Sequence, residues 1–111
     1  MKRIIDTGIT QELLNGDNNP QLQILNKLYV VDDRQKTFEK IQEVQADETI
    51  DEKERIKKQY ELALGEQEAR EILELNLPVQ KTIYLSYCIM AAITGENPEE
   101  LMQRAKESKN E

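Results

Sequence analysis

The segment IYLSYCIMAAI, residues 83–93, most restricts how this chain can fold. Ser86 is its only residue that is neither apolar nor aromatic, whereas 33% of the whole chain is charged. A membrane-spanning helix needs about 20 apolar residues, so this run is too short to cross a bilayer. The run must therefore be covered by protein, which comes either from this chain or from another.

A helix that is apolar nearly all the way round is the expected structure for this run, with Pro78 at its start and Gly95 at its end. Such a helix is normally buried on several sides, so we expect it to be the central helix and to contribute most of the folding free energy. A second interpretation leaves one side free for another subunit or a client. It places Tyr84, Tyr87 and Met90 at a partner or oligomer interface, because Tyr and Met are enriched there.

Cap residues predict the neighbouring helices. Asp32 and Asp33 suit the start of one helix, and Thr49 with Glu52 matches a capping box for the next. Asn97, followed by proline, predicts the start of the last helix. The expected helices cover about residues 32–45, 49–64, 66–75, 78–94 and 98–107.

Apolar periodicity predicts which side chains of the amphipathic helices point inward. The predicted set is Phe38, Ile41, Val44 or Gln45, then Ile56, Tyr60, Ala63 and Leu64, then Ala69, Ile72 and Leu73.

Residues 22–31 can be interpreted in two ways. Leu22 and Ile24 alternate with glutamine, and β-branched residues cluster at Val30 and Val31, which favours a small hairpin or a kinked strand. A helix through Leu22, Leu25 and Leu28 remains the alternative, because short apolar runs are ambiguous.

The fold class predicted is mainly α, with a short N-terminal strand or hairpin followed by four to five short packed helices. Turn-forming residues such as those of NGDNNP predict a flexible N-terminal segment over residues 1–20. Residues 21–107 are expected to form a single helical domain, and residues 108–111 a frayed tail. A polar chain of 111 residues has a thin core, so a homo-oligomer is also expected.

The sequence lacks the residues that usual catalytic sites need. It has no histidine, and no glycine-rich phosphate loop or nucleophile-elbow motif. Acidic pairs such as Asp47 and Asp51 are spaced as on a solvated helix face. We therefore expect no enzyme activity, no cofactor and no metal site. Cys88, the one cysteine, is expected to be a small buried apolar residue in a cytoplasmic protein, and the N-terminus does not resemble a signal peptide.

The net charge of −7 falls entirely beyond residue 31, because the three basic and three acidic residues before that point balance. Such a surface disfavours binding to nucleic acid and to anionic membranes. Protein partners are expected instead.

The order of the segments LQILNKLYVVDD, RQKTFEKIQEV, LALGEQEAREILEL and TIYLSYCIMAAITGENPEELMQ resembles the tail assembly chaperones of long-tailed bacteriophages and prophages, especially of Gram-positive hosts. The resemblance extends from Gln21 to about Arg104, and no single residue is diagnostic.

This resemblance implies a non-catalytic helical protein of the bacterial host cytoplasm. It would bind the tape-measure protein and tail-tube subunits, self-assemble, and be absent from the mature virion. A longer product made by ribosomal frameshifting is also implied. Two alternatives remain, an acidic regulatory or inhibitor module that binds a basic DNA-handling partner, and an oligomeric adaptor without a client.

Overall fold

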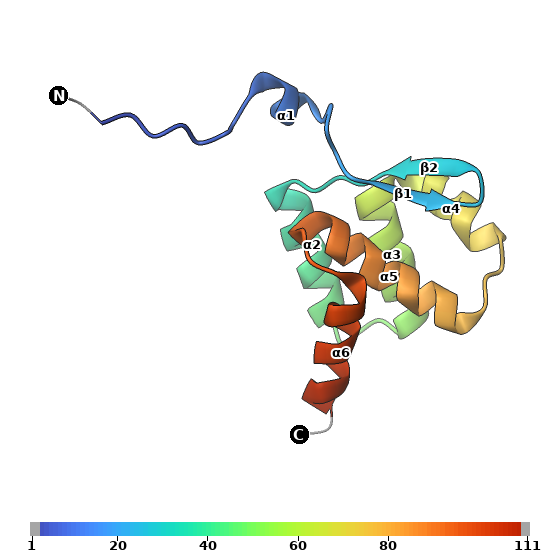
Figure 1. Ribbon diagram of the computed structural model, residues 1–111. Helices are drawn as coiled ribbons and strands as arrows, with labels where there is room; N and C mark the ends of the chain where they lie inside the picture. Colours follow the sequence, from blue (N-terminus) through green and yellow to red (C-terminus); the bar gives the residue numbers. More distant parts are fainter. Residues whose placement is uncertain (1–2, 110–111) are drawn as a thin grey trace.

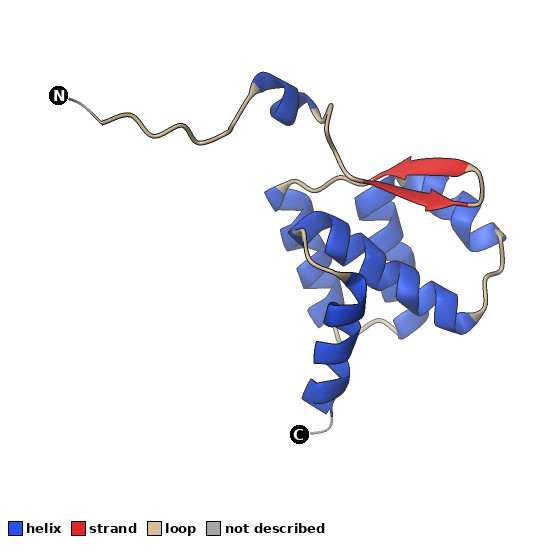
Figure 2. Ribbon diagram, viewed as in Figure 1, coloured by secondary structure: helices blue, strands red, loops and turns tan. Residues whose placement is uncertain are grey.

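The computed structural model describes residues 3–109, and the chain is mainly helical with one two-stranded antiparallel hairpin before the packed helices, as predicted (Figures 1 and 2). Of the tail expected to fray, residues 110–111 lie outside the described residues, as do residues 1–2 of the N-terminal segment. The elements in order are α1 (Gln11–Asn15), β1 (Gln21–Ile24), β2 (Lys27–Val30), α2 (Gln35–Ala46), α3 (Glu52–Leu64), α4 (Glu66–Glu74), α5 (Val79–Thr94) and α6 (Pro98–Lys109).

The hairpin confirms the strand interpretation of residues 22–31. Its strands join at Leu25 and Asn26, and Leu22 lies opposite Tyr29 in the register. Tyr29 is buried, and Leu22 and Ile24 pack against the core. The apolar residues of β1 therefore face the helices, and β1 contacts α5.

The central helix is α3, so the prediction that the apolar helix α5 is central was wrong. α3 contacts α2, α4 and α5, and it supplies the buried residues Ile56, Gln59, Tyr60, Ala63 and Leu64. α5 contacts α3, β1 and α6, and it fully buries only Leu85, Ile89 and Ala91. Because these neighbours leave part of its circumference uncovered, most of its other apolar side chains are half-buried.

Most predicted inward residues are buried, namely Ile41, Ile56, Tyr60, Ala63, Leu64, Ala69 and Ile72. Leu73 was wrongly assigned to the core, because it is 40% exposed at the end of α4. Val44 is half-buried whereas Gln45 is exposed, which settles the choice between them.

The N-cap of α3 is Asp51, so the capping box predicted at Thr49 and Glu52 was wrong. The Asp51 carboxylate accepts a hydrogen bond from the backbone N–H of Glu54 at 2.9 Å. Thr49 instead donates its hydroxyl to Asp47 Oδ1 at 2.5 Å in the preceding loop. Asp51 and Glu54 repeat the spacing of a capping box two residues further on.

Helix α2 begins at Gln35, after the acidic pair that was predicted to cap it, and neither carboxylate caps a backbone N–H of the helix. Asp32 accepts hydrogen bonds from Arg34 Nε and Nη2, each at 2.9 Å, and from Thr37 Oγ1 at 2.8 Å. The hydrogen bonds from Arg34 are the main cause that lowers the pKa of Asp32 to about 2. Asp32 therefore ties the end of the hairpin to the first turn of α2.

The predicted ends of the other helices agree with the structure. Gly65 ends α3 with φ +103°, and its N–H donates to the Glu61 carbonyl at 3.0 Å. A side chain there would be strained, because residues other than glycine rarely adopt this φ. Gly95 ends α5, and Asn97 Oδ1 accepts the Glu99 N–H at 2.9 Å to start α6.

Two polar contacts join α3 to α5 inside the core. Gln59, which is 2% exposed, accepts a hydrogen bond from Ser86 Oγ at 2.5 Å and donates to the Ser86 carbonyl at 3.2 Å. Tyr60 donates its hydroxyl to the Thr82 carbonyl at 2.9 Å. No buried side-chain nitrogen or oxygen lacks a partner in the part of the chain that the structure describes.

Candidate interaction surfaces

The three residues predicted to form an interface lie on α5 in different surroundings. Tyr84 donates its hydroxyl to Glu99 Oε1 of α6 at 2.8 Å, and the Lys81 ammonium lies 5.7 Å from the centre of its ring. Met90 packs against the core, and Tyr87 is half-buried. All three are half-buried, so each keeps surface that a partner could cover. Their role in an interface stays a prediction.

Tyr84 and Tyr60 are expected to ionise late. The hydrogen bond to Glu99 is the main cause that raises the pKa of Tyr84 to about 12, and burial raises the pKa of Tyr60 to about 12. Because the folded state favours the neutral phenol, the stabilisation is complete below pH 10 and is lost as the pH rises from 10 to 12. We expect an ultraviolet titration to show a phenolate component near pH 12 that decreases stepwise in Tyr60→Phe and Tyr84→Phe. Absence of such a component in the folded protein, or no change in it in the two variants, would contradict this.

Large apolar side chains are exposed in three places, and this is the main feature that the sequence did not predict. The first is the arm, residues 3–15, which extends away from the packed helices (Figure 1). The second is the outer side and turn of the hairpin, and the third is the α4–α5 corner, defined here as Leu73, Leu75, Val79 and Ile83. The exposed residues of the arm and hairpin are Ile4, Ile5, Ile9, Leu13, Leu14, Leu25, Leu28 and Val30.

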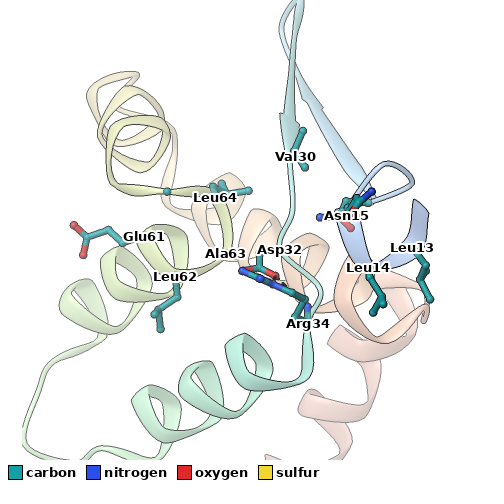
Figure 3. A pocket seen from close by; sticks show the side chains of 13 residues that line it. Leu13, Leu14, Asn15, Val30, Asp32, Arg34, Glu61, Leu62, Ala63 and Leu64 are labelled. Carbon is teal, nitrogen blue, oxygen red and sulfur yellow. Dashed lines mark hydrogen bonds and ion pairs between the residues drawn. The ribbon is translucent and has the colours of Figure 1, made fainter. Parts of the chain in front are cut away.

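A groove lies between the arm and the body, with a volume of about 430 Å³. Leu13 and Leu14 of α1 line one side, and Leu62 and Leu64 of α3 line the other (Figure 3). The ion pair between Asp32 and Arg34 lies between the two sides (Figure 3). Val30 and Ala63 also line the groove, together with Asn15, Asn19 and Glu61, so its lining mixes apolar and polar side chains around the ion pair.

A second hollow, of about 480 Å³, adjoins the groove because Glu61 and Leu62 line both. Val44 gives it apolar surface, and its charged lining residues are Lys40, Glu43, Lys58, Glu61 and Glu66. None of these five forms an ion pair with another described residue. The two hollows together form a track of mixed apolar and polar lining, and the second hollow is its charged outer end.

The sequence did carry a signal for the arm. Five large aliphatic residues occur within the first fourteen positions, which is more than a solvated linker needs. The turn residues around Asn15 and Gly16 drew the interpretation toward flexibility. The structure places a short helix, α1, in this segment, with Thr10 Oγ1 accepting the Leu13 N–H at 3.2 Å.

Residues 3–109 contain no group of three or more His, Cys, Asp or Glu side chains placed to hold a metal ion. Cys88 is half-buried, and burial is the main cause that raises the pKa of its thiol.

No helix within the described residues is both long enough and apolar enough to cross a membrane.

Comparison of the chain with protein-family models, curated proteins and solved structures found no match.

Proposed function

We propose that this chain is a non-catalytic tail assembly chaperone of a long-tailed bacteriophage or prophage. It binds the tape-measure protein and tail-tube subunits in the cytoplasm of a bacterial host, and it is not retained in the mature virion. The proposal rests on the resemblance of residues 21–104 to that family and on the apolar surface that α5 offers to a client.

The incomplete burial of α5 is the observation that carries the proposal. Residues 83–93 form the most apolar run of the chain, yet only Leu85, Ile89 and Ala91 of this helix are buried. Ile83 is 39% exposed, and Tyr87 is half-buried on the same helix. Exposed apolar surface of this kind, next to the apolar α4–α5 corner, is typical of protein-binding sites.

A long helical client suits this surface because an amphipathic helix can lay its apolar stripe against α5. The acidic charge of the remaining surface keeps the chaperone soluble while the apolar patch is open. Binding that depends on burial of apolar area should persist at high salt, whereas binding between opposite charges weakens as salt screens them.

The test is a pull-down with the tagged full-length chain from its native host after prophage induction, read by mass spectrometry at low and high salt. We expect a very long, helix-rich protein that stays bound at high salt. In a double variant, Ile83→Ser with Tyr87→Ser, recovery of this client should fall about tenfold or more, since burying even one such side chain is worth about that factor. Gln80→Ser, an exposed position on the same helix, is the matched control and should bind as the parent does.

Two outcomes would contradict the proposal. Recovery of a basic DNA-handling protein that washes off as salt rises would favour the acidic regulatory module. Recovery of this chain alone would favour an oligomeric adaptor. Thermal melts of both variants must match that of the parent, so that lost binding is not lost folding.

A further inference from the structure

The arm extends away from the packed helices of its own copy (Figure 1). Thr10 caps the start of α1, and the N–H groups of Gly16 and Asp17 donate to the carbonyls of Leu13 and Glu12 at 3.2 and 3.1 Å, which closes its other end. From Thr10 toward the N-terminus, the chain extends away from the packed helices (Figure 1). Its three isoleucines are almost without cover, with Ile4 91%, Ile5 71% and Ile9 64% exposed.

The arm of one copy cannot fill its own groove in this arrangement. Leu13 and Leu14 already line one side of the groove, and the three isoleucines lie further out along the same segment. The apolar lining supplied by Val30 and Leu62 thus faces only Leu13 and Leu14 of the same copy and none of its isoleucines.

An arm from a second copy has both the length and the charge to fit. Residues 3–10 can span up to about 27 Å when extended, close to the shortest dimension of the molecule, 26 Å. Arg3 lies at the outer end of the arm, whereas residues 32–111 carry 12 basic and 19 acidic residues, a net charge of −7. Residues 3–10 carry Arg3 and Asp6 and are neutral overall, so this segment meets an acidic body without the repulsion that two acidic bodies exert on each other.

We propose that copies of this chain associate by arm exchange, with the three isoleucines of one arm seated in the groove of another copy. Arg3 of the incoming arm then lies toward the charged outer end of the track, near Glu61 and Glu66. Each copy gives one arm and receives one. The inference specifies how the self-association in the proposed function occurs, and it does not depend on the identity of the client.

Cross-linking between single-cysteine chains tests the exchange. Both chains carry Cys88→Ser; one also carries Ile9→Cys in the arm, and the other, with a different tag, Val30→Cys in the groove. They are co-expressed and treated with a short bismaleimide. We expect a heterodimer band containing both tags, at least tenfold more intense than in a control where Ile83→Cys on α5 replaces Val30→Cys.

A chain that carries both Ile9→Cys and Val30→Cys separates exchange from folding back. Exchange gives cross-linked dimers and larger species, whereas an arm that folds onto its own groove gives only internally cross-linked monomers. The second result, or equal cross-linking to position 83, would overturn the proposal.

Sedimentation of the full-length triple variant, Ile4→Ser, Ile5→Ser and Ile9→Ser, provides an independent measure. These side chains are exposed in the single copy, so at a concentration where the parent is monomeric the thermal melt of the variant should match that of the parent. We expect the protein concentration at which half of the chains are associated to rise about tenfold or more, because burial of one isoleucine already changes an association constant by roughly that factor. Unchanged association would overturn arm exchange. Cross-linking with no client recovered would instead uphold exchange and contradict the chaperone function.

Discussion

Replacing Ile89 with alanine is expected to lower the free energy of unfolding by about 2–5 kcal/mol. Ile89 is 0% exposed and lies in the core where α5 meets the rest of the fold. The substitution removes buried methyl groups and leaves a cavity that the surrounding helices fill only in part. Since domains of this size are stable by about 5–15 kcal/mol, the loss is a large fraction of the total. Urea unfolding followed by circular dichroism measures it.

Ile83→Ala is the matched control, because it makes the same chemical change on the same helix. Ile83 is 39% exposed, so its truncation should cost about 1 kcal/mol or less. Equal losses at the two positions would contradict the orientation of α5 described above.

Ser86→Ala is expected to cost about 1–3 kcal/mol, more than removal of one small hydroxyl from a surface. The substitution removes the Ser86 hydroxyl, which donates a hydrogen bond to Gln59 Oε1 at 2.5 Å. Gln59 is too buried for a water molecule to take the place of this hydroxyl freely. The other hydrogen bond of Gln59, to the Ser86 carbonyl, remains. The free energy of unfolding from urea titration again gives the value.

A double-mutant cycle with Gln59→Met isolates the cause. When both partners are replaced by apolar groups of similar size, no buried oxygen is left without a donor. We therefore expect the double variant to be more stable than Ser86→Ala alone. Strictly additive losses, or a cost below about 0.5 kcal/mol for Ser86→Ala, would show that the bridge is unimportant.

Local patterns predicted the elements of this fold well, because each depends on neighbouring residues. The hairpin follows from alternation around Leu22 and Ile24, and the end of α3 follows from Gly65. The cap at Thr49 failed because Thr49 lies in the loop, where it donates its hydroxyl to Asp47, while Asp51 accepts the helix N–H, and propensity alone cannot rank Thr49 against Asp51.

The position of each helix in the assembly could not be predicted, because it depends on contacts between distant segments. Apolar content made α5 look central, although burial is decided by how much of a helix its neighbours cover. The polar helix α3 takes that place, and Gln59 is buried there because Ser86, far along the sequence, satisfies it. The predicted interface residues Tyr84, Tyr87 and Met90 stay a prediction. The exposure of the arm was not predicted, because a sequence does not show whether isoleucine side chains will be buried by other parts of the fold.

The bridge between Gln59 and Ser86 also sets the rotation of α5 about its own axis. Successive residues of an α-helix are about 100° apart, so turning α5 by one residue would carry Ser86 out of reach and strand Gln59 in the core. The same turn would move Ile89 away from the core and bring a different set of side chains to the outside. One buried polar pair therefore fixes the rotation of α5, and it decides which face of the most apolar helix the protein presents to its surroundings.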